Sequence, residues 1–175
     1  MAFLTERYQY VLEQRGYDIR NVRAVTRSLD DSPVDARRKL EVLPEFTASP
    51  HFQKLAVAFK RVKNIARELG DDHHLDEVSD PDLRNWLKEP AEIELLRELD
   101  ERGPAIDTFL KSGENLRRAF VEAAQFGPAV DRFFTEIFVM VDDAALRKAR
   151  LRLMKRLEQQ ILRIADISEI VSETE

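Results

Sequence analysis

A row of basic side chains marks the helix that the sequence predicts over residues 143–171. At 100° per residue the apolar positions fall on one side, formed by Leu146, Leu153, Leu157, Ile161 and Ile164. The opposite side carries Lys148, Arg152, Lys155, Arg156 and Arg163, with Gln159 among them. Such a face is suited to contact a polyanion, because only Glu158 interrupts the cations. A solvated outer face whose cations pair with nearby acids has the same pattern, so both interpretations stay open.

A second helix with one polar flank is predicted over residues 50–69. Its apolar stripe consists of Phe52, Leu55, Phe59, Val62, Ala66 and Leu69. Lys60, Asn64 and Arg67 fall together on the opposite flank, with Arg61 nearby. Cations beside an amide form a combination that can hold phosphates and hydrogen-bond to base edges.

Two further residues stand out for their chemistry. Arg150 lies on the apolar side of its predicted helix, so its guanidinium must be paired there, and Asp142 or Asp143 is the partner that we expect. Trp86 lies in the short segment PDLRNWL. We favour a small hydrophobic contact for its ring over an exposed platform on which a base stacks.

Most catalytic and metal-binding chemistries have no candidate residues. There is no cysteine, and the 5 glycines form neither GxxxxGK[ST] nor GxGxxG. With 3 histidines and no GxSxG, a Ser-His-Asp triad has few possible members. The cluster DDHHLDE at residues 71–77 contains His73 and His74 among carboxylates. Adjacent residues of a polar loop point in different directions, so a solvated loop is favoured over a metal site.

The elements that position these residues are predicted to be helices. The 175 residues are 43% hydrophobic and 35% charged, with 5 Gly and 7 Pro, which favours a single all-α domain. We expect an N-terminal helical segment over residues 1–48 that leads into a helical bundle over residues 49–175. The apolar run FFTEIFVMV is predicted to be a buried helix. Pro and Gly positions place the helices near 3–15, 17–29, 33–43, 50–69, 80–88, 90–102, 104–111, 113–126, 128–141 and 143–171.

Charge is distributed unevenly along the chain. The net charge is −5, yet residues 52–69 hold 5 basic residues against 1 acidic residue. Residues 143–165 hold 7 basic against 2 acidic residues, whereas residues 70–102 hold 12 acidic against 4 basic residues. An acidic total therefore leaves room for a local basic surface. No run approaches the ~18 apolar residues of a membrane span, and the start MAFLTERYQY does not resemble a secretion signal, so a cytoplasmic location is expected.

Several segments resemble one known family. The run FFTEIFVMVDDAALRKARLRLM at 133–154, followed by IADIS at 164–168, resembles the C-terminal end of the β subunit of bacterial tetrameric glycyl-tRNA synthetases. FKRVKNI at 59–65 and EPAE at 89–92 resemble upstream segments of that subunit. DAALR at 143–147 carries the D-A-x-L-R pattern of the DALR anticodon-binding domains. The resemblance extends over about residues 1–171.

This resemblance implies a fold and a function. It implies an all-α bundle of the DALR anticodon-binding type that is one part of a larger subunit of an aminoacyl-tRNA synthetase. The implied partners are the anticodon stem-loop of tRNA(Gly), the rest of the β subunit, and the α subunit in an α2β2 tetramer. ATP and Mg would be used at the active site of the α subunit. No catalytic residue and no cofactor are therefore expected in this chain.

The resemblance also suggests a role for the two polar faces. Unstacked anticodon bases are bound through stacking and edge hydrogen bonds, while Lys and Arg hold phosphates. Asn64 and Gln159 then become candidates for base contacts. The candidates for phosphate contacts are Lys60, Arg61, Arg67, Lys148, Arg152, Lys155 and Arg156. Arg147 fits either a phosphate contact or a structural role.

Two alternatives remain beside this interpretation. One is the corresponding domain of an arginyl-tRNA synthetase, although those chains typically end in a short apolar terminus that closes on Met, and this one ends IVSETE. The other is a helical docking domain for subunit assembly, on whose surface the cations serve only solubility.

Overall fold

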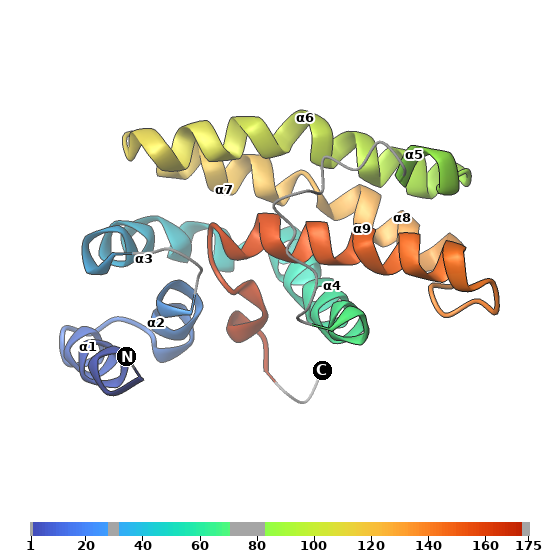
Figure 1. The fold of residues 1–175 in the computed structure, drawn as a ribbon. Helices are drawn as coiled ribbons and strands as arrows, with labels where there is room; N and C mark the ends of the chain where they lie inside the picture. Colours follow the sequence, from blue (N-terminus) through green and yellow to red (C-terminus); the bar gives the residue numbers. More distant parts are fainter. Residues whose placement is uncertain (1, 28–31, 71–82, 173–175) are drawn as a thin grey trace.

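The computed structural model describes residues 2–27, 32–70 and 83–172. This part of the chain contains helices and no strand, which confirms the predicted all-α class (Figure 1). None of its helices has the length and apolar content needed to span a membrane. The elements are α1 (Ala2–Gln14), α2 (Ile19–Thr26), α3 (Pro33–Thr47), α4 (Pro50–Ala66), η1 (Arg67–Leu69), α5 (Leu83–Trp86), α6 (Pro90–Ser112), α7 (Leu116–Ala124), α8 (Gly127–Glu136), α9 (Ala144–Leu162) and η3 (Ile167–Ile170).

Side-chain caps fix where several helices begin. The Asp18 side chain accepts from the backbone N–H groups of Arg20 and Asn21 at the start of α2. Ser32 precedes Pro33 and accepts from the backbone N–H of Asp35. Asp143 accepts in the same way at the start of α9, from residues 145 and 146. Each cap satisfies N–H groups that have no partner within the helix.

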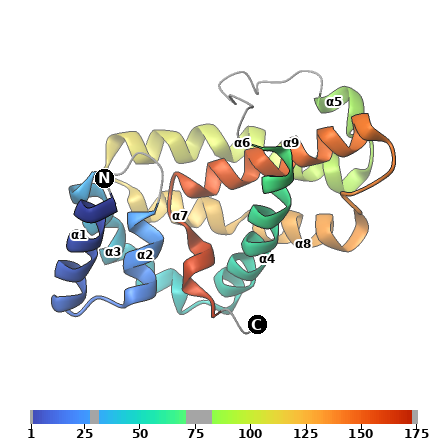
Figure 2. The same ribbon diagram turned by 60° about the horizontal axis from the view of Figure 1, so that its bottom comes forward.

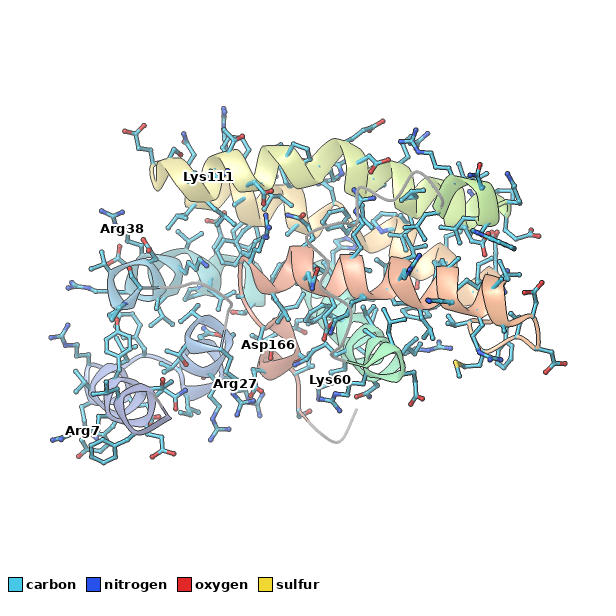
Figure 3. All side chains as sticks on the ribbon, in the orientation of Figure 1. Arg7, Arg27, Arg38, Lys60, Lys111 and Asp166 are labelled. Carbon is cyan, nitrogen blue, oxygen red and sulfur yellow. The ribbon has the colours of Figure 1, made fainter. Side chains whose placement is uncertain are left out.

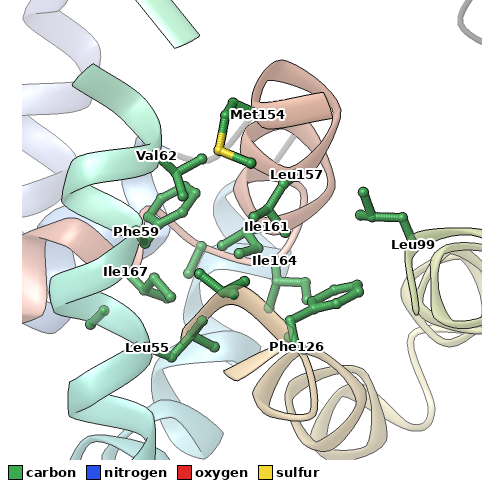
Figure 4. Close-up of a cluster of buried hydrophobic side chains, with 14 of the residues drawn as sticks. Leu55, Phe59, Val62, Leu99, Phe126, Met154, Leu157, Ile161, Ile164 and Ile167 are labelled. Carbon is green, nitrogen blue, oxygen red and sulfur yellow. The ribbon is translucent and has the colours of Figure 1, made fainter. Parts of the chain in front are cut away.

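The core lies where α4 crosses α9. Figure 4 shows Val62 of α4 beside Met154 of α9 at one end of a cluster that also contains Phe59, Leu157 and, at its other end, Leu55, and all five side chains are buried. Ile161 of α9 belongs to the same cluster, and Phe126, Ile164 and Ile167 close it from outside the two helices. The two predicted apolar stripes are therefore confirmed as the inward faces of their helices.

Helices α6 and α9 run in parallel and are joined by three ion pairs (Figures 1 and 2). From the start of both helices to their ends, the pairs are Glu92–Arg150, Asp100–Arg156 and Asp107–Arg163, each 2.6 Å long. On the opposite side of α9, η3 lies between α2 and α4. This leaves α6 and the α2–η3–α4 group on two different sides of the bundle.

The predicted break at Gly103-Pro104 is wrong, because α6 continues through it. Gly103 is buried against α9, and a Cβ there would lie 3.0 Å from Gln160 Oε1. Glycine at this position therefore leaves room for the end of the Gln160 side chain and does not end the helix. In the same way α3 continues through Pro44 to Thr47 and does not stop at residue 43.

The predicted buried helix over 128–141 is also wrong beyond Glu136, where α8 ends. Ile137 and Val139 are buried, whereas Phe138 and Met140 are 70% and 46% exposed. This alternation fits an extended backbone, whose side chains point to opposite sides in turn. An evenly apolar sequence cannot distinguish the two conformations by periodicity.

The helix predicted over 143–171 ends at Leu162. Lys39, which is buried, donates from Nζ to the carbonyl of Arg163 over 2.9 Å, and the backbone N–H of Asp166 donates to the Ala24 carbonyl over 2.8 Å. Both bonds come from residues more than 100 positions away in the sequence, so local sequence rules could not reveal this end.

Candidate nucleic-acid interface

The candidate residues of α4 and η1 lie near one another on the surface. Arg61 is exposed, and its guanidinium lies 4.3 Å from the centre of the Phe134 ring in α8. Asn64 is exposed and its Oδ1 accepts from Arg67 Nη1 at 3.3 Å. Lys60 is half-buried and donates to the carbonyl of Ser172 over 2.8 Å. Arg61, Asn64 and Arg67 are therefore accessible, while Lys60 holds the C-terminal segment against α4.

The first turns of α9 contain one accessible cation and one structural arginine. Lys148 is exposed and makes no hydrogen bond or ion pair with the described residues. Arg147 donates from Nη1 to the Val141 carbonyl over 2.9 Å, which holds the segment before the helix. Arg152 is half-buried. Of the two roles expected for Arg147, this geometry favours the structural one.

The second half of the predicted basic row is engaged within the bundle. Lys155 lies 2.8 Å from Glu158, and Arg156 lies 2.6 Å from Asp100. Partial burial alone would raise the pKa of Asp100, but the guanidinium groups of Arg84 and Arg156 hold this pKa below its usual value. Gln159 is half-buried. Arg156 thus points toward α6, away from the α4 residues.

The ten candidates therefore do not form one continuous face. Lys60 binds the segment after η3 and Arg61 lies over the Phe134 ring of α8, whereas Arg156 is paired with Asp100 on the side of α6. In Figure 3 the Lys60 label lies beside Asp166, on the side of α9 away from α6. The exposed residues Arg61, Asn64, Arg67 and Lys148 are the ones available to a ligand.

Comparison with known proteins identifies the family. The DALR anticodon binding domain matches residues 55–170. The chain belongs to the DALR anticodon binding domain family. Its α9 and η3, and α4 from Leu55 onward, lie within the matched range, which confirms the fold that the D-A-x-L-R pattern implied. The helices α1, α2 and α3 precede it.

Curated relatives extend over nearly the whole chain. It is 37% identical over 173 residues to the glycine–tRNA ligase β subunit of Anaeromyxobacter dehalogenans strain 2CP-C. This alignment covers 99% of this chain and 24% of that protein. It is 36% identical to the β subunit of Acidobacterium capsulatum over 98% of this chain and 25% of that protein. It is 32% identical to the β subunit of Escherichia coli O139:H28, and this alignment covers 95% of this chain and 23% of that protein. The chain thus spans about a quarter of the length of these relatives.

Arg150 is paired as expected, but the predicted partner is wrong. Its Nε donates to Glu92 Oε1 over 2.6 Å, and its Nη1 donates to the Phe138 carbonyl over 2.7 Å. Glu92 also accepts from the backbone N–H groups of Lys88 and Glu89. The EPAE segment, which resembles the β subunits of glycyl-tRNA synthetases, therefore provides the buried partner of a residue in α9.

The remaining expectations concern Trp86 and the His73-His74 loop. Trp86 is 48% exposed, while Leu83 and Leu87 provide the buried contacts of this segment. The predicted hydrophobic contact thus falls mainly to the two leucines. The loop of His73 and His74 lies outside the described residues. Within the described ranges, no group of three His, Asp or Glu side chains could hold a metal ion.

One basic feature of α2 escaped the sequence analysis. Arg20, Arg23 and Arg27 share the exposed face of α2, which the structure brings alongside η3. The signal was their spacing of three and four residues in a helix without an acidic residue. Nothing in the sequence indicated that this helix lies near the one that carries Asn64.

Proposed function

We propose that this chain is the anticodon-binding part of a glycine–tRNA ligase β subunit and binds the anticodon stem-loop of tRNA(Gly). The DALR match over residues 55–170 carries this proposal. The relatives that are 32% to 37% identical to it over the aligned residues are named glycine–tRNA ligase β subunits, which favours the glycine enzyme over an arginyl-tRNA synthetase.

The exposed polar side chains of α4 and η1 support a contact with RNA. Asn64 has a donor and an acceptor, as needed to bind the edge of an unstacked base. Arg61 and Arg67 lie within one helical turn of Asn64 and provide charge for the adjoining phosphates. Lys148 is the corresponding accessible cation of α9.

The division of labour in the enzyme follows from the same proposal. ATP, Mg and glycine would be bound by the α subunit, and this chain would position tRNA for the reaction without contributing a catalytic group. The rest of the β subunit and the α subunit of an α2β2 assembly would be its protein partners. Such an assembly acts in the cytoplasm, where its tRNA substrate is found.

The test is direct binding of a labelled anticodon stem-loop, measured by fluorescence anisotropy with cognate and scrambled loops. Asn64→Ala is expected to weaken cognate binding by about 5- to 150-fold, by analogy with the ~1–3 kcal/mol of a base-edge contact in duplexes, and to affect the scrambled loop much less. Asn115→Ala is the matched control, since Asn115 is exposed at the start of α7 and its side chain makes no capping hydrogen bond.

Two results would contradict the proposal. The first is an absence of binding by the unmodified chain at low salt, which would favour a docking domain for subunit assembly. The second is equal affinity for cognate and scrambled loops combined with an Asn64→Ala variant that behaves like Asn115→Ala.

A further inference from the structure

The exposed face of α2 carries a row of three arginines. Arg20, Arg23 and Arg27 follow the spacing i, i+3 and i+7, so they lie on one side of the helix. The residues that α2 buries are Asn21, Val22, Ala24 and Val25. Arg27 forms an ion pair with Glu169 of η3. Arg20 and Arg23 are exposed, and their side chains make no hydrogen bond or ion pair with any residue that the structure describes.

This row lies on the same side of the molecule as the candidate residues of α4. The backbone of η3 is joined to α2 through the bond from Asp166 N–H to the Ala24 carbonyl. Its other side is joined to α4, because Lys63 Nζ lies 2.7 Å from Asp166 Oδ2. Figure 3 shows Arg27, Asp166 and Lys60 in that order along one side of the molecule, with Lys111 of α6 on the opposite side.

Together, these elements form a basic surface on an acidic protein. Residues 19–27 and 57–67 contain seven Lys and Arg and no Asp or Glu, with the exposed acids Asp18 and Glu68 directly before the first range and directly after the second. The acids between them, Asp166 and Glu169, are already paired with Lys63 and Arg27. Since the net charge of the chain is −5, this concentration of cations creates a local potential opposite in sign to the total. A polyanion is the ligand that such a surface attracts.

We infer that Arg20 and Arg23 hold backbone phosphates of the same RNA whose anticodon loop is proposed to contact Asn64. The inference rests on the proposed function and extends the RNA interface into α2, which precedes the family match over 55–170. Continuity with the cations of α4 favours RNA over an acidic protein. Guanidinium groups bind phosphate oxygens through two parallel hydrogen bonds, and such contacts carry no base preference.

The double variant Arg20→Ala/Arg23→Ala tests this inference. Each lost phosphate contact reduces the slope of log affinity against log salt by about 0.7–0.9, so two contacts reduce it by about 1.4–1.8. The reduction is expected to be equal for cognate and scrambled stem-loops. Arg20→Lys/Arg23→Lys should retain a slope close to that of the parent, because the two charges remain.

The control is Arg97→Ala/Lys111→Ala, which removes the same charge from exposed positions of α6 on the other side of the molecule. Its salt slope should match that of the parent. If the parent binds the stem-loop and the α2 alanine variant has an unchanged slope, the inference is wrong and the proposed function stands. An equal reduction in the α6 control also overturns it, since net charge alone would explain the effect. A parent that binds no RNA overturns the proposed function itself.

Discussion

Arg150 and Glu92 form a buried ion pair that ties α9 to the first turn of α6. The two side chains are only 8% and 0% exposed, and Arg150 Nε lies 2.6 Å from Glu92 Oε1. Each side chain of the pair also bonds to the backbone. Glu92 accepts from the N–H groups of Lys88 and Glu89, and Arg150 donates to the carbonyl of Phe138. One pair thus connects the start of α6, the second turn of α9 and the segment before α9.

Removing only the arginine of this pair should destabilise the domain strongly. Arg150→Met leaves the Glu92 carboxylate buried without its countercharge, and such a loss typically costs about 3–5 kcal/mol of the free energy of unfolding. Urea unfolding followed by circular dichroism measures this. Arg97→Met is the control, because the Arg97 side chain is 60% exposed and a surface change of this kind should stay within about 0.5 kcal/mol.

The double variant Glu92→Gln/Arg150→Met should lose less stability than Arg150→Met alone. Glutamine has no charge to bury, and its carbonyl oxygen can still accept from the backbone N–H groups of Lys88 and Glu89. Equal losses in the single and the double variant would mean that the uncompensated charge is not the source of the effect.

The sequence predicted the inward faces of this bundle well, because burial follows the helical period. Phe59 and Leu157 were expected in the core and are buried there. Asp18 and Ser32 lie directly before helices and cap them. These features depend on residues within four positions of one another, which is the range that periodicity and capping describe.

The features that the sequence missed depend on contacts between distant segments. In the non-helical segment 137–143, the carbonyl groups of Val141 and Phe138 accept from Arg147 and Arg150. The sequence predicted a nearby aspartate as the partner of Arg150, whereas the actual partner, Glu92, is 58 positions away. The candidate site was predicted residue by residue from charge and resemblance. Local spacing could not show that Arg156 points to α6, because this direction is set by Asp100.

Two members of the predicted basic row should respond differently in RNA binding. Lys148 is exposed and unpaired among the described residues, so Lys148→Ala should reduce the slope of log affinity against log salt by about 0.7–0.9. Arg156 is engaged by Asp100, and Arg156→Ala should leave the slope close to that of the parent. Anisotropy titrations of the stem-loop at several salt concentrations measure both. The assignment fails if Arg156→Ala changes the slope as much as Lys148→Ala does.

Two glycines provide a matched test of backbone conformation. Gly113 ends α6 with φ of 63°, in the left-handed region, and Gly113→Ala should cost about 1–2 kcal/mol of stability. Gly127 begins α8 without a positive φ, and a Cβ there would meet no atom within 4 Å. Gly127→Ala should therefore stabilise by about 0.4–1 kcal/mol, because alanine restricts the unfolded chain. Thermal unfolding of both variants measures the change in stability. If both substitutions stabilise the domain, or both destabilise it, this account is contradicted.

Asp100 should make part of the stability depend on pH in the acid range. The guanidinium groups of Arg84 and Arg156 outweigh partial burial and lower the pKa of Asp100 in the folded state, while an aspartate in the unfolded chain has a pKa of about 3.9. A carboxylate with a depressed pKa contributes stability above the unfolded value and loses it as the pH falls through the folded value. Asp100→Asn should therefore be less stable than the parent near pH 6, and the difference should shrink as the pH falls through the depressed pKa of Asp100 in the folded state.

The size of this effect is limited by exposure. The Asp100 side chain is 29% exposed and the Arg84 side chain is 72% exposed, so each pair should contribute no more than about 1 kcal/mol, which corresponds to about 2–4 °C in Tm for a domain of this length. Thermal unfolding of the parent and Asp100→Asn, followed from pH 6 down to acid pH below the unfolded pKa of about 3.9, measures it. Glu101→Gln on the same helix is the control, because Glu101 is exposed. A difference between the parent and Asp100→Asn that persists unchanged at the lowest pH would show that the amide disturbs packing and that charge is not the cause.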